Sequence, residues 1–186
     1  MITVVIGGSA SGVGKTTLTC GLIRALPEFG WTAIKISRHA HGVPGQLIEE
    51  TEAGQGSDTA RYLAAGAKRA LLVTAVGTAT PMAALDVACD GCTHAVIESN
   101  LILEALTPDV CLAIVGDGEA KPSFTRVLQC ADAVVVRRRQ VLETSPASAS
   151  ARVFCMDDLG CLPPEFIGWL RERIGSVSAR SKTAQS

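Results

Sequence analysis

The chain has almost no net charge and few charged residues. Its 17 Lys and Arg residues are balanced by 18 Asp and Glu residues, which gives a net charge of −1 at pH 7 over 186 residues. This balance provides no electrostatic reason to expect a nucleic-acid or membrane partner. Charged residues make up 19% of the chain and hydrophobic residues 47%, a composition that favours a compact globular protein over a disordered one.

Long hydrophobic runs are also missing, and we expect no targeting signal. No apolar run reaches the ~18 residues that a membrane-spanning helix needs, so we expect no membrane span. The first ten residues lack the basic start of a secretory signal. The seven cysteines are an odd number in a chain of this size, which favours reduced thiols and a cytoplasmic protein over a disulfide-bonded one.

Residues 4–17 carry the strongest motif of the chain, VVIGGSASGVGKTT. An apolar strand over residues 2–6 leads into a Gly/Ser loop and then into an apolar-periodic helix, which is the setting of a phosphate-binding P-loop. Lys15 would reach the β- and γ-phosphates, and the Thr16 hydroxyl would bind Mg²⁺. Ser9 stands where the P-loop pattern has its first Gly. The residues expected to bind the nucleotide here are Ser11, Gly12, Val13, Gly14, Lys15, Thr16 and Thr17.

Apolar runs and helical segments alternate along the rest of the chain. Strands are predicted at 2–6, 31–37, 70–75, 94–98, 110–115, 133–136 and 152–155, and helices at 16–26, 57–65, 81–88, 101–106, 124–130 and 164–174. We expect Ser57 and Thr80, with Pro81 after it, to cap two of these helices. The alternation predicts an α/β domain with a doubly wound, mostly parallel sheet and helices on both faces. Residues 1–175 would form this single nucleotide-binding domain, and residues 176–186 a flexible tail.

A long polar loop follows the second predicted strand, over residues 37–58. We expect that strand to lie beside the P-loop strand, so that the loop faces the phosphates. Lys35 stands near the strand end, where a cation would neutralise a γ-phosphate or an anionic substrate. Arg38, His39 and His41 follow it. The alternative interpretation of these side chains is a solvated loop.

This region resembles a known family. Ile34-Lys35, the His-containing loop, the run GSDTAR at 56–61 and the run AGA at 65–67 resemble the molybdopterin-guanine dinucleotide biosynthesis protein B (MobB) family, P-loop NTPases of the SIMIBI type. The resemblance covers about residues 1 to 100. It implies a GTP-binding accessory protein of molybdenum cofactor biosynthesis, usually a homodimer, with a molybdopterin guanylyltransferase or a molybdoenzyme maturation protein as partner.

The same resemblance assigns roles to two residues of the second helix. Asp58 and Arg61 would line the nucleotide or partner face. The alternative for Asp58 is a first-turn acid that stabilises the helix dipole. The P-loop also resembles those of dethiobiotin and cobyrinate synthetases, which are ATP-dependent enzymes. Partitioning ATPases carry a second lysine five residues before the invariant one, and here that position is Ala10, so no lysine acting across a dimer is expected.

Glu98 ends the apolar strand at 94–98. In P-loop proteins an acid at such a strand end holds Mg²⁺ or orients the attacking water, so Lys15 and Glu98 are the candidate catalytic residues. The MobB family has Glu-Gly at the equivalent strand end, and here Ser99 and Asn100 follow the acid instead. The alternative is a strand-terminal acid at a turn.

The residues that would read the base are not evident. Guanine-specific relatives end a late strand with Asn-Lys-x-Asp, whereas here the strand at 133–136 continues with Arg137-Arg138-Arg139-Gln140. This run contains no acid, so we expect little discrimination between GTP and ATP. The arginines are more simply a solvated surface than an anion-binding site.

Cys89 and Cys92 form a C-x-x-C pair, which is half of a zinc site or a redox pair. Further ligands would have to come from Cys155, Cys161, His39 or His41, and buried structural thiols are the alternative.

Three functions are therefore open: the accessory protein with weak GTP hydrolysis, an ATP-dependent ligase or kinase for a small molecule, and a metal-delivery GTPase resembling nickel-insertion proteins.

Overall fold

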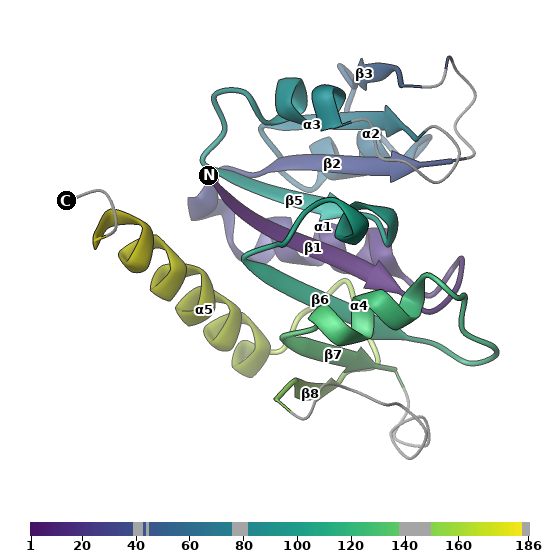
Figure 1. The fold of residues 1–186 in the computed structure, drawn as a ribbon, viewed down its shortest axis with the longest axis vertical. Coiled ribbons are helices and arrows are strands. Elements are labelled where there is room, and N and C mark those ends of the chain that lie inside the picture. Colours follow the sequence, from purple (N-terminus) through teal and green to yellow (C-terminus); the bar gives the residue numbers. More distant parts are fainter. Residues whose placement is uncertain (39–42, 44, 76–81, 138–149, 184–186) are drawn as a thin grey trace.

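The computed structural model describes residues 1–38, 43, 45–75, 82–137 and 150–183. Within these residues, eight strands form one sheet in the order β3-β4-β2-β5-β1-β6-β7-β8. Their bounds are β1 Ile2–Gly8, β2 Thr32–Ser37, β3 Leu47–Glu49, β4 Arg69–Thr74, β5 His94–Glu98, β6 Val110–Val115, β7 Ala133–Val136 and β8 Arg152–Cys155. Figure 1 shows that the carboxyl ends of the central strands lie together at one edge of the sheet.

All recorded strand pairs are parallel except that of β3 with β4. The predicted mostly parallel α/β sheet is therefore confirmed. The short antiparallel strand β3 was missed, because three residues inside a polar loop carry too little hydrophobic pattern to indicate a strand. It pairs only at the edge of the sheet, through β4.

Helices cover both faces of the sheet. They are α1 Lys15–Ala25, α2 Asp58–Ala64, α3 Met82–Cys89, α4 Phe124–Cys130 and α5 Pro164–Thr183, with 3₁₀ turns η1 at Pro27–Phe29 and η2 at Leu101–Glu104. Side chains of α1, α2 and α5 share one hydrophobic core with the sheet, and those of α3, η2 and α4 share the other. The chain is thus a three-layer α/β structure.

Strand β1 lies at the centre of this arrangement, between β5 and β6. Val4 and Ile6 belong to the core under α1, and Val5 belongs to the opposite core. All three are fully buried. A strand covered on both faces must be apolar at successive positions, which explains the continuous run of valine and isoleucine before the loop.

Several boundaries differ from those predicted. Strand β5, and not β2, lies beside β1, so the loop after β2 is one strand farther from the P-loop than expected. Helix α5 continues past Ile174 to Thr183, into the segment expected to be a tail. The helix predicted at 101–106 is the shorter turn η2. Ser57 does cap α2, since its Oγ accepts from the N–H of Ala60 at 3.0 Å. The Thr80-Pro81 cap lies outside the described residues.

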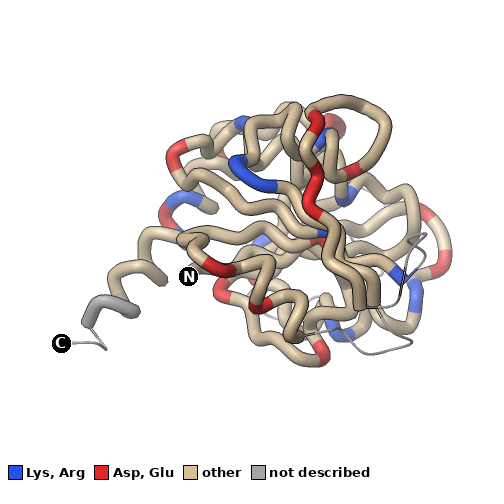
Figure 2. The backbone as a smooth tube through the Cα atoms, turned by 90° about the horizontal axis from the view of Figure 1, so that it is seen from above, with Lys and Arg blue, Asp and Glu red and all other residues tan. Residues whose placement is uncertain are grey.

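Acidic and basic positions are interspersed over the fold (Figure 2). Within the part of the chain that the structure describes, no helix has both the length and the apolar character to span a membrane.

Candidate functional site

The loop between β1 and α1 ends in a left-handed glycine. Gly14 has φ +100° and is the N-cap of α1, and no side chain caps this helix. The first turn of α1 contains no acidic residue. The N–H groups at the start of a helix have no intrahelical partner, and the helix dipole makes this end electropositive. The geometry is therefore suited to an oxyanion.

The serine at position 9 has a structural explanation. A Cβ at Gly8 would lie 2.6 Å from Cγ2 of Val13, so Gly8 provides the close approach of strand and loop. The buried Ser9 side chain accepts a hydrogen bond from the N–H of Gly116 at 3.0 Å, which ties the loop to the segment after β6. Gly8, one residue earlier, thus takes the place of the first glycine of the usual P-loop pattern.

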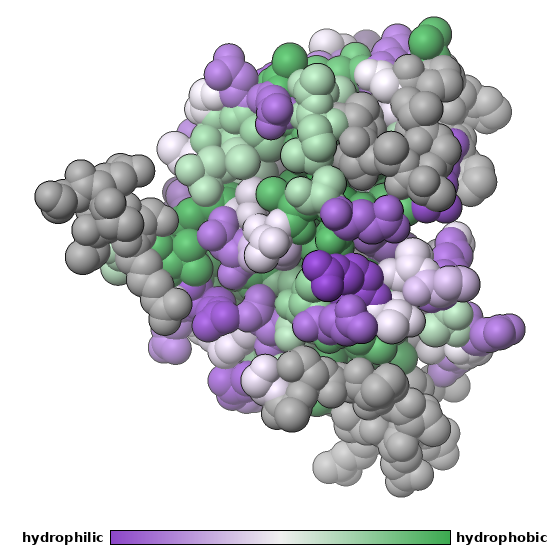
Figure 3. Space-filling model, in the orientation of Figure 1, coloured by the Kyte–Doolittle hydropathy of each residue, from purple (hydrophilic) through white to green (hydrophobic). Residues whose placement is uncertain are grey.

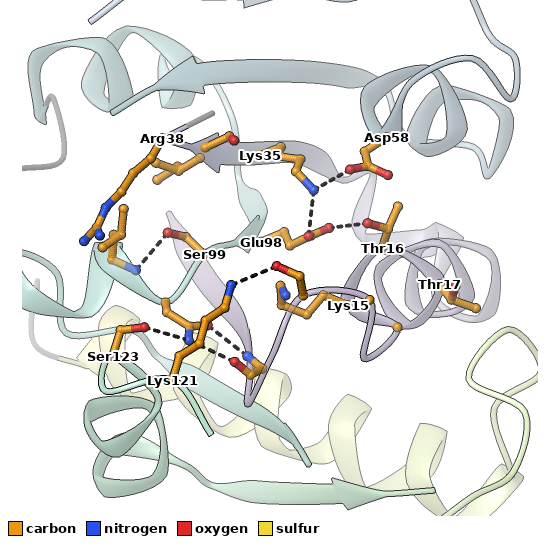
Figure 4. Close-up of a pocket in the computed structure, with 18 of the residues that line it drawn as sticks. Lys15, Thr16, Thr17, Lys35, Arg38, Asp58, Glu98, Ser99, Lys121 and Ser123 are labelled. Atoms are coloured by element: carbon orange, nitrogen blue, oxygen red, sulfur yellow. Dashed lines mark hydrogen bonds and ion pairs between the residues drawn. The ribbon is translucent and has the colours of Figure 1, made fainter. Parts of the chain in front are cut away.

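A pocket of about 520 Å³ opens over this loop (Figure 4). Ten of the residues predicted from sequence line it: Ser11, Gly12, Gly14, Lys15, Thr16, Thr17, Lys35, Asp58, Arg61 and Glu98. Val13 instead lines a second hollow on the other side of the loop. Arg38 also lines the pocket, whereas His39 and His41 lie outside the described residues.

Glu98 is the buried centre of the pocket, with a side chain only 4% exposed. Its carboxylate accepts hydrogen bonds from the Thr16 hydroxyl at 2.8 Å, from Nζ of Lys35 at 2.9 Å and from the Tyr62 hydroxyl. These donors come from α1, β2 and α2. A buried carboxylate needs such partners, because an unpaired one is costly to desolvate.

Lys35 joins Glu98 to Asp58, and Asp58 in turn pairs with Arg61 at 3.5 Å. Burial disfavours the charged form of Lys35, but the two carboxylates outweigh it and raise its pKa. Burial likewise works against the ionised form of Asp58, yet the hydrogen bond and charge of Lys35 prevail and lower its pKa. Lys35 and Asp58 are therefore both charged at neutral pH.

Lys15 curls back over the loop, and its Nζ donates to the carbonyl of Ala10 at 3.2 Å. Burial lowers the pKa of Lys15, with partial compensation from the charge of Glu98. No carboxylate is paired with its ammonium group within the described chain. The ammonium group of Lys15 is thus available in the pocket to bind an anionic ligand.

The structure adds four residues that the sequence did not single out for the site: Tyr62, Asn100, Lys121 and Ser123. The Asn100 side chain holds the end of β1 by two hydrogen bonds of 2.9 Å, one to the carbonyl and one from the N–H of Gly8. Nζ of Lys121 donates to Oγ of Ser11 at 2.8 Å. Asn100 stood out only as a departure from the MobB pattern, and Lys121 belongs to no motif.

The second hollow, of about 460 Å³, lies across the loop from the first and is lined by residues 10–13 and by strand ends. Asp117 follows β6, Arg137 follows β7 and Asp157 follows β8, and all three line it. We expected an acid for the base only directly after Val136. The parallel sheet brings acids from the ends of β6 and β8, which lie on either side of β7, to the same hollow.

Cys89 and Cys92 lie far from this edge. Cys89 ends α3 and Cys92 precedes β5 at its amino end, where the Cys92 thiol is 3.3 Å from the sulfur of Met1. Glu98 stands at the carboxyl end of the same strand. Burial raises the pKa of Cys89 to about 12. In the described ranges no three His, Cys, Asp or Glu residues are grouped to hold a metal ion.

A P-loop that joins the central strand of a parallel sheet to an uncapped helix, with an acid on the adjacent strand, defines the P-loop NTPase fold. No family model and no curated protein sequence matches the chain.

LpxK, HypB and MobB are among the solved structures that are similar to it. LpxK from Aquifex aeolicus, in complex with ATP, is 14% identical with a TM-score of 0.49, over 82% of this chain and 53% of that one. HypB from Helicobacter pylori, in complex with nickel, is 17% identical with a TM-score of 0.48, over 94% and 88%. Bacillus subtilis MobB is 16% identical with a TM-score of 0.43, over 92% and 97%. The chain thus spans about half of the length of LpxK.

The Lys35→Met variant should lower the free energy of unfolding by about 2 kcal/mol, because Glu98 then remains buried with two neutral donors. Adding Glu98→Gln to Lys35→Met should recover part of this loss. Urea unfolding of both variants, with Lys68→Met as an exposed control, measures the difference. An equal loss in Lys35→Met and in the double variant would contradict the ion pair.

Proposed function

We propose that the chain binds a magnesium–nucleoside triphosphate over the P-loop and hydrolyses it slowly. One observation carries this proposal: Thr16, at the uncapped start of α1, is hydrogen-bonded to Glu98 at the end of the adjacent strand. Phosphate groups would bind to the helix N-terminus, and the acid would lie next to the terminal phosphate. Lys15 would contact the β- and γ-phosphates.

The oxygen donors present fit Mg²⁺. Thr16, Asp58 and Glu98 would hold the ion directly or through water, since Mg²⁺ prefers hydroxyl, carboxylate and water oxygens. When bound, Mg²⁺ neutralises phosphate charge. Glu98 is also placed to orient the attacking water, and Lys35 forms ion pairs with both Glu98 and Asp58.

We place the base in the second hollow, because it adjoins residues 10–13 of the same loop. The exposed carboxylates of Asp117 and Asp157 there would accept hydrogen bonds from the N–H groups of a guanine edge. Arg137 would not, because a guanidinium only donates hydrogen bonds. This supports GTP as the ligand, with a modest preference over ATP.

The more specific function we propose is that of a GTP-binding accessory protein in molybdenum cofactor biosynthesis, acting as a homodimer with a guanylyltransferase or a molybdoenzyme maturation partner. It is supported by the MobB-like residues Lys35, Asp58 and Arg61, which gather in the pocket. An ATP-dependent ligase or kinase is the second candidate, favoured by a further hollow that is lined by the cations Arg38, Lys121 and Arg126. The distance of Cys89 and Cys92 from the phosphate edge disfavours metal delivery through this pair.

The Lys15→Ala variant should weaken triphosphate binding at least ~100-fold, about 2.7 kcal/mol, while the fold is kept. The fold is kept because, among the described residues, the Lys15 side chain makes a single hydrogen bond, to the Ala10 carbonyl. Calorimetry of a slowly hydrolysed GTP analogue measures it, with Lys68→Ala as the control. Unchanged affinity in a folded variant would refute the P-loop assignment.

The Glu98→Gln variant should reduce turnover more than binding, by about tenfold or more in kcat. The amide keeps the shape of the carboxylate but removes the charge that orients the ion and the water. Phosphate release at saturating GTP and Mg²⁺ is the measurement, with circular dichroism to verify folding. Equal turnover of variant and wild type would exclude this role.

The Asp157→Asn variant should lower the preference for GTP over ATP by about threefold to tenfold, because one carboxylate acceptor for the guanine edge is lost. Competition between labelled GTP and ATP gives the ratio. Asp158→Asn is the matched control, since that neighbouring acid does not line the second hollow. A ratio that changes equally in both variants would place the base elsewhere.

A further inference from the structure

A third hollow, of about 600 Å³, adjoins the phosphate pocket. It is lined by Arg38, Glu104, Lys121, Pro122, Ser123, Thr125, Arg126 and Gln129. Arg38, Lys121 and Ser123 line the phosphate pocket as well. The two hollows therefore lie next to each other and have these side chains in common.

The charges of this hollow are predominantly positive. Arg38, Lys121 and Arg126 face one acid, Glu104, so that three cations stand against one anion. The structure records no ion pair for any of the three cations within its described residues. In a protein of net charge −1, a hollow with unpaired cations points to an anionic ligand.

Arg126 is oriented by a contact within the protein. Its Nε donates to the carbonyl of Leu103 at 3.3 Å. The planar guanidinium is thereby anchored through one nitrogen, and its two terminal nitrogens, which have no recorded partner among the described residues, can donate to a carboxylate or a phosphate. Arg126 lies on α4, and Figure 3 shows hydrophilic residues gathered on the face where α4 lies in Figure 1.

Lys121 connects the hollow to the P-loop. Its N–H donates to the carbonyl of Ser9 and its Nζ to the Ser11 hydroxyl, both at 2.8 Å. In Figure 4, Arg38 and Ser123 lie on one side of the phosphate pocket, and Thr16 and Asp58 lie on the other, with Lys121 between them. An anion in the third hollow would therefore lie beside the phosphate end of the nucleotide.

We propose that this third hollow binds a second ligand: a small molecule with a phosphate or carboxylate group, held by Arg38, Lys121 and Arg126 next to the triphosphate. The proposal rests on the proposed triphosphate site in one respect, namely that the triphosphate is the neighbour of the bound anion. The anion itself is bound by side chains outside the P-loop. A macromolecular polyanion is disfavoured, since basic and acidic positions are interspersed over the rest of the fold (Figure 2).

The test is a calorimetric titration of the full chain, first saturated with Mg²⁺ and a non-hydrolysable triphosphate so that the P-loop is filled. Inorganic phosphate and succinate are titrated separately at constant ionic strength, which distinguishes a phosphate from a carboxylate group. We expect one or both to bind, and Arg126→Gln to weaken that binding about tenfold or more. The affinity for the triphosphate should be unchanged in this variant.

Arg171→Gln is the matched control, because Arg171 is an exposed arginine paired with Glu28 outside this hollow. The phosphate and succinate titrations are repeated on Lys15→Ala without nucleotide, so that this test of the anion site does not depend on triphosphate binding. If the analogue does not bind to wild type, the triphosphate site is wrong, and the Lys15→Ala titration still tests the anion. The second-ligand site would be overturned if neither phosphate nor succinate bound to wild type or to Lys15→Ala. It would also be overturned if wild type and Arg126→Gln bound them equally.

Discussion

The burial of one carboxylate determines the arrangement of the site. Glu98 is 4% exposed and is satisfied by donors from α1, β2 and α2, namely Thr16, Lys35 and Tyr62. An ionised carboxylate removed from water costs several kcal/mol unless such donors are present, on the order of the whole stability of a domain. The three elements must therefore meet at the end of β5, and this meeting forms the wall of the phosphate pocket.

The sheet provides the rest of the geometry. Because β1 lies between β5 and β6, the P-loop emerges between an acid on one side and the Lys121 segment on the other. Asn100 fixes the end of β1 through both hydrogen-bonding groups of Gly8, and Ser9 ties the loop to Gly116. The loop is thus held from two neighbouring strands before any ligand binds, which lowers the ordering cost of binding.

Much of this could be predicted from local pattern. The P-loop, the parallel strands and the pairing of Glu98 with the start of α1 follow from apolar runs, glycine spacing and the rule that ligands bind at carboxyl strand ends. Strand order could not be predicted, since β2 and β5 carry equally apolar runs, and so β2 was placed one strand too close to β1. Lys121 and Asp157 were missed because no local motif marks a side chain whose role depends on contacts with distant strands.

The most direct test of the central claim is backbone amide exchange, measured on the full chain with and without a slowly hydrolysed GTP analogue and Mg²⁺. A triphosphate held by the helix N-terminus bonds the N–H groups of the loop, so exchange at residues 12–17 should slow by about tenfold or more. Chelation of Mg²⁺ should remove much of this protection. Exchange at residues 12–17 that is unchanged by saturating nucleotide and Mg²⁺ would contradict the account.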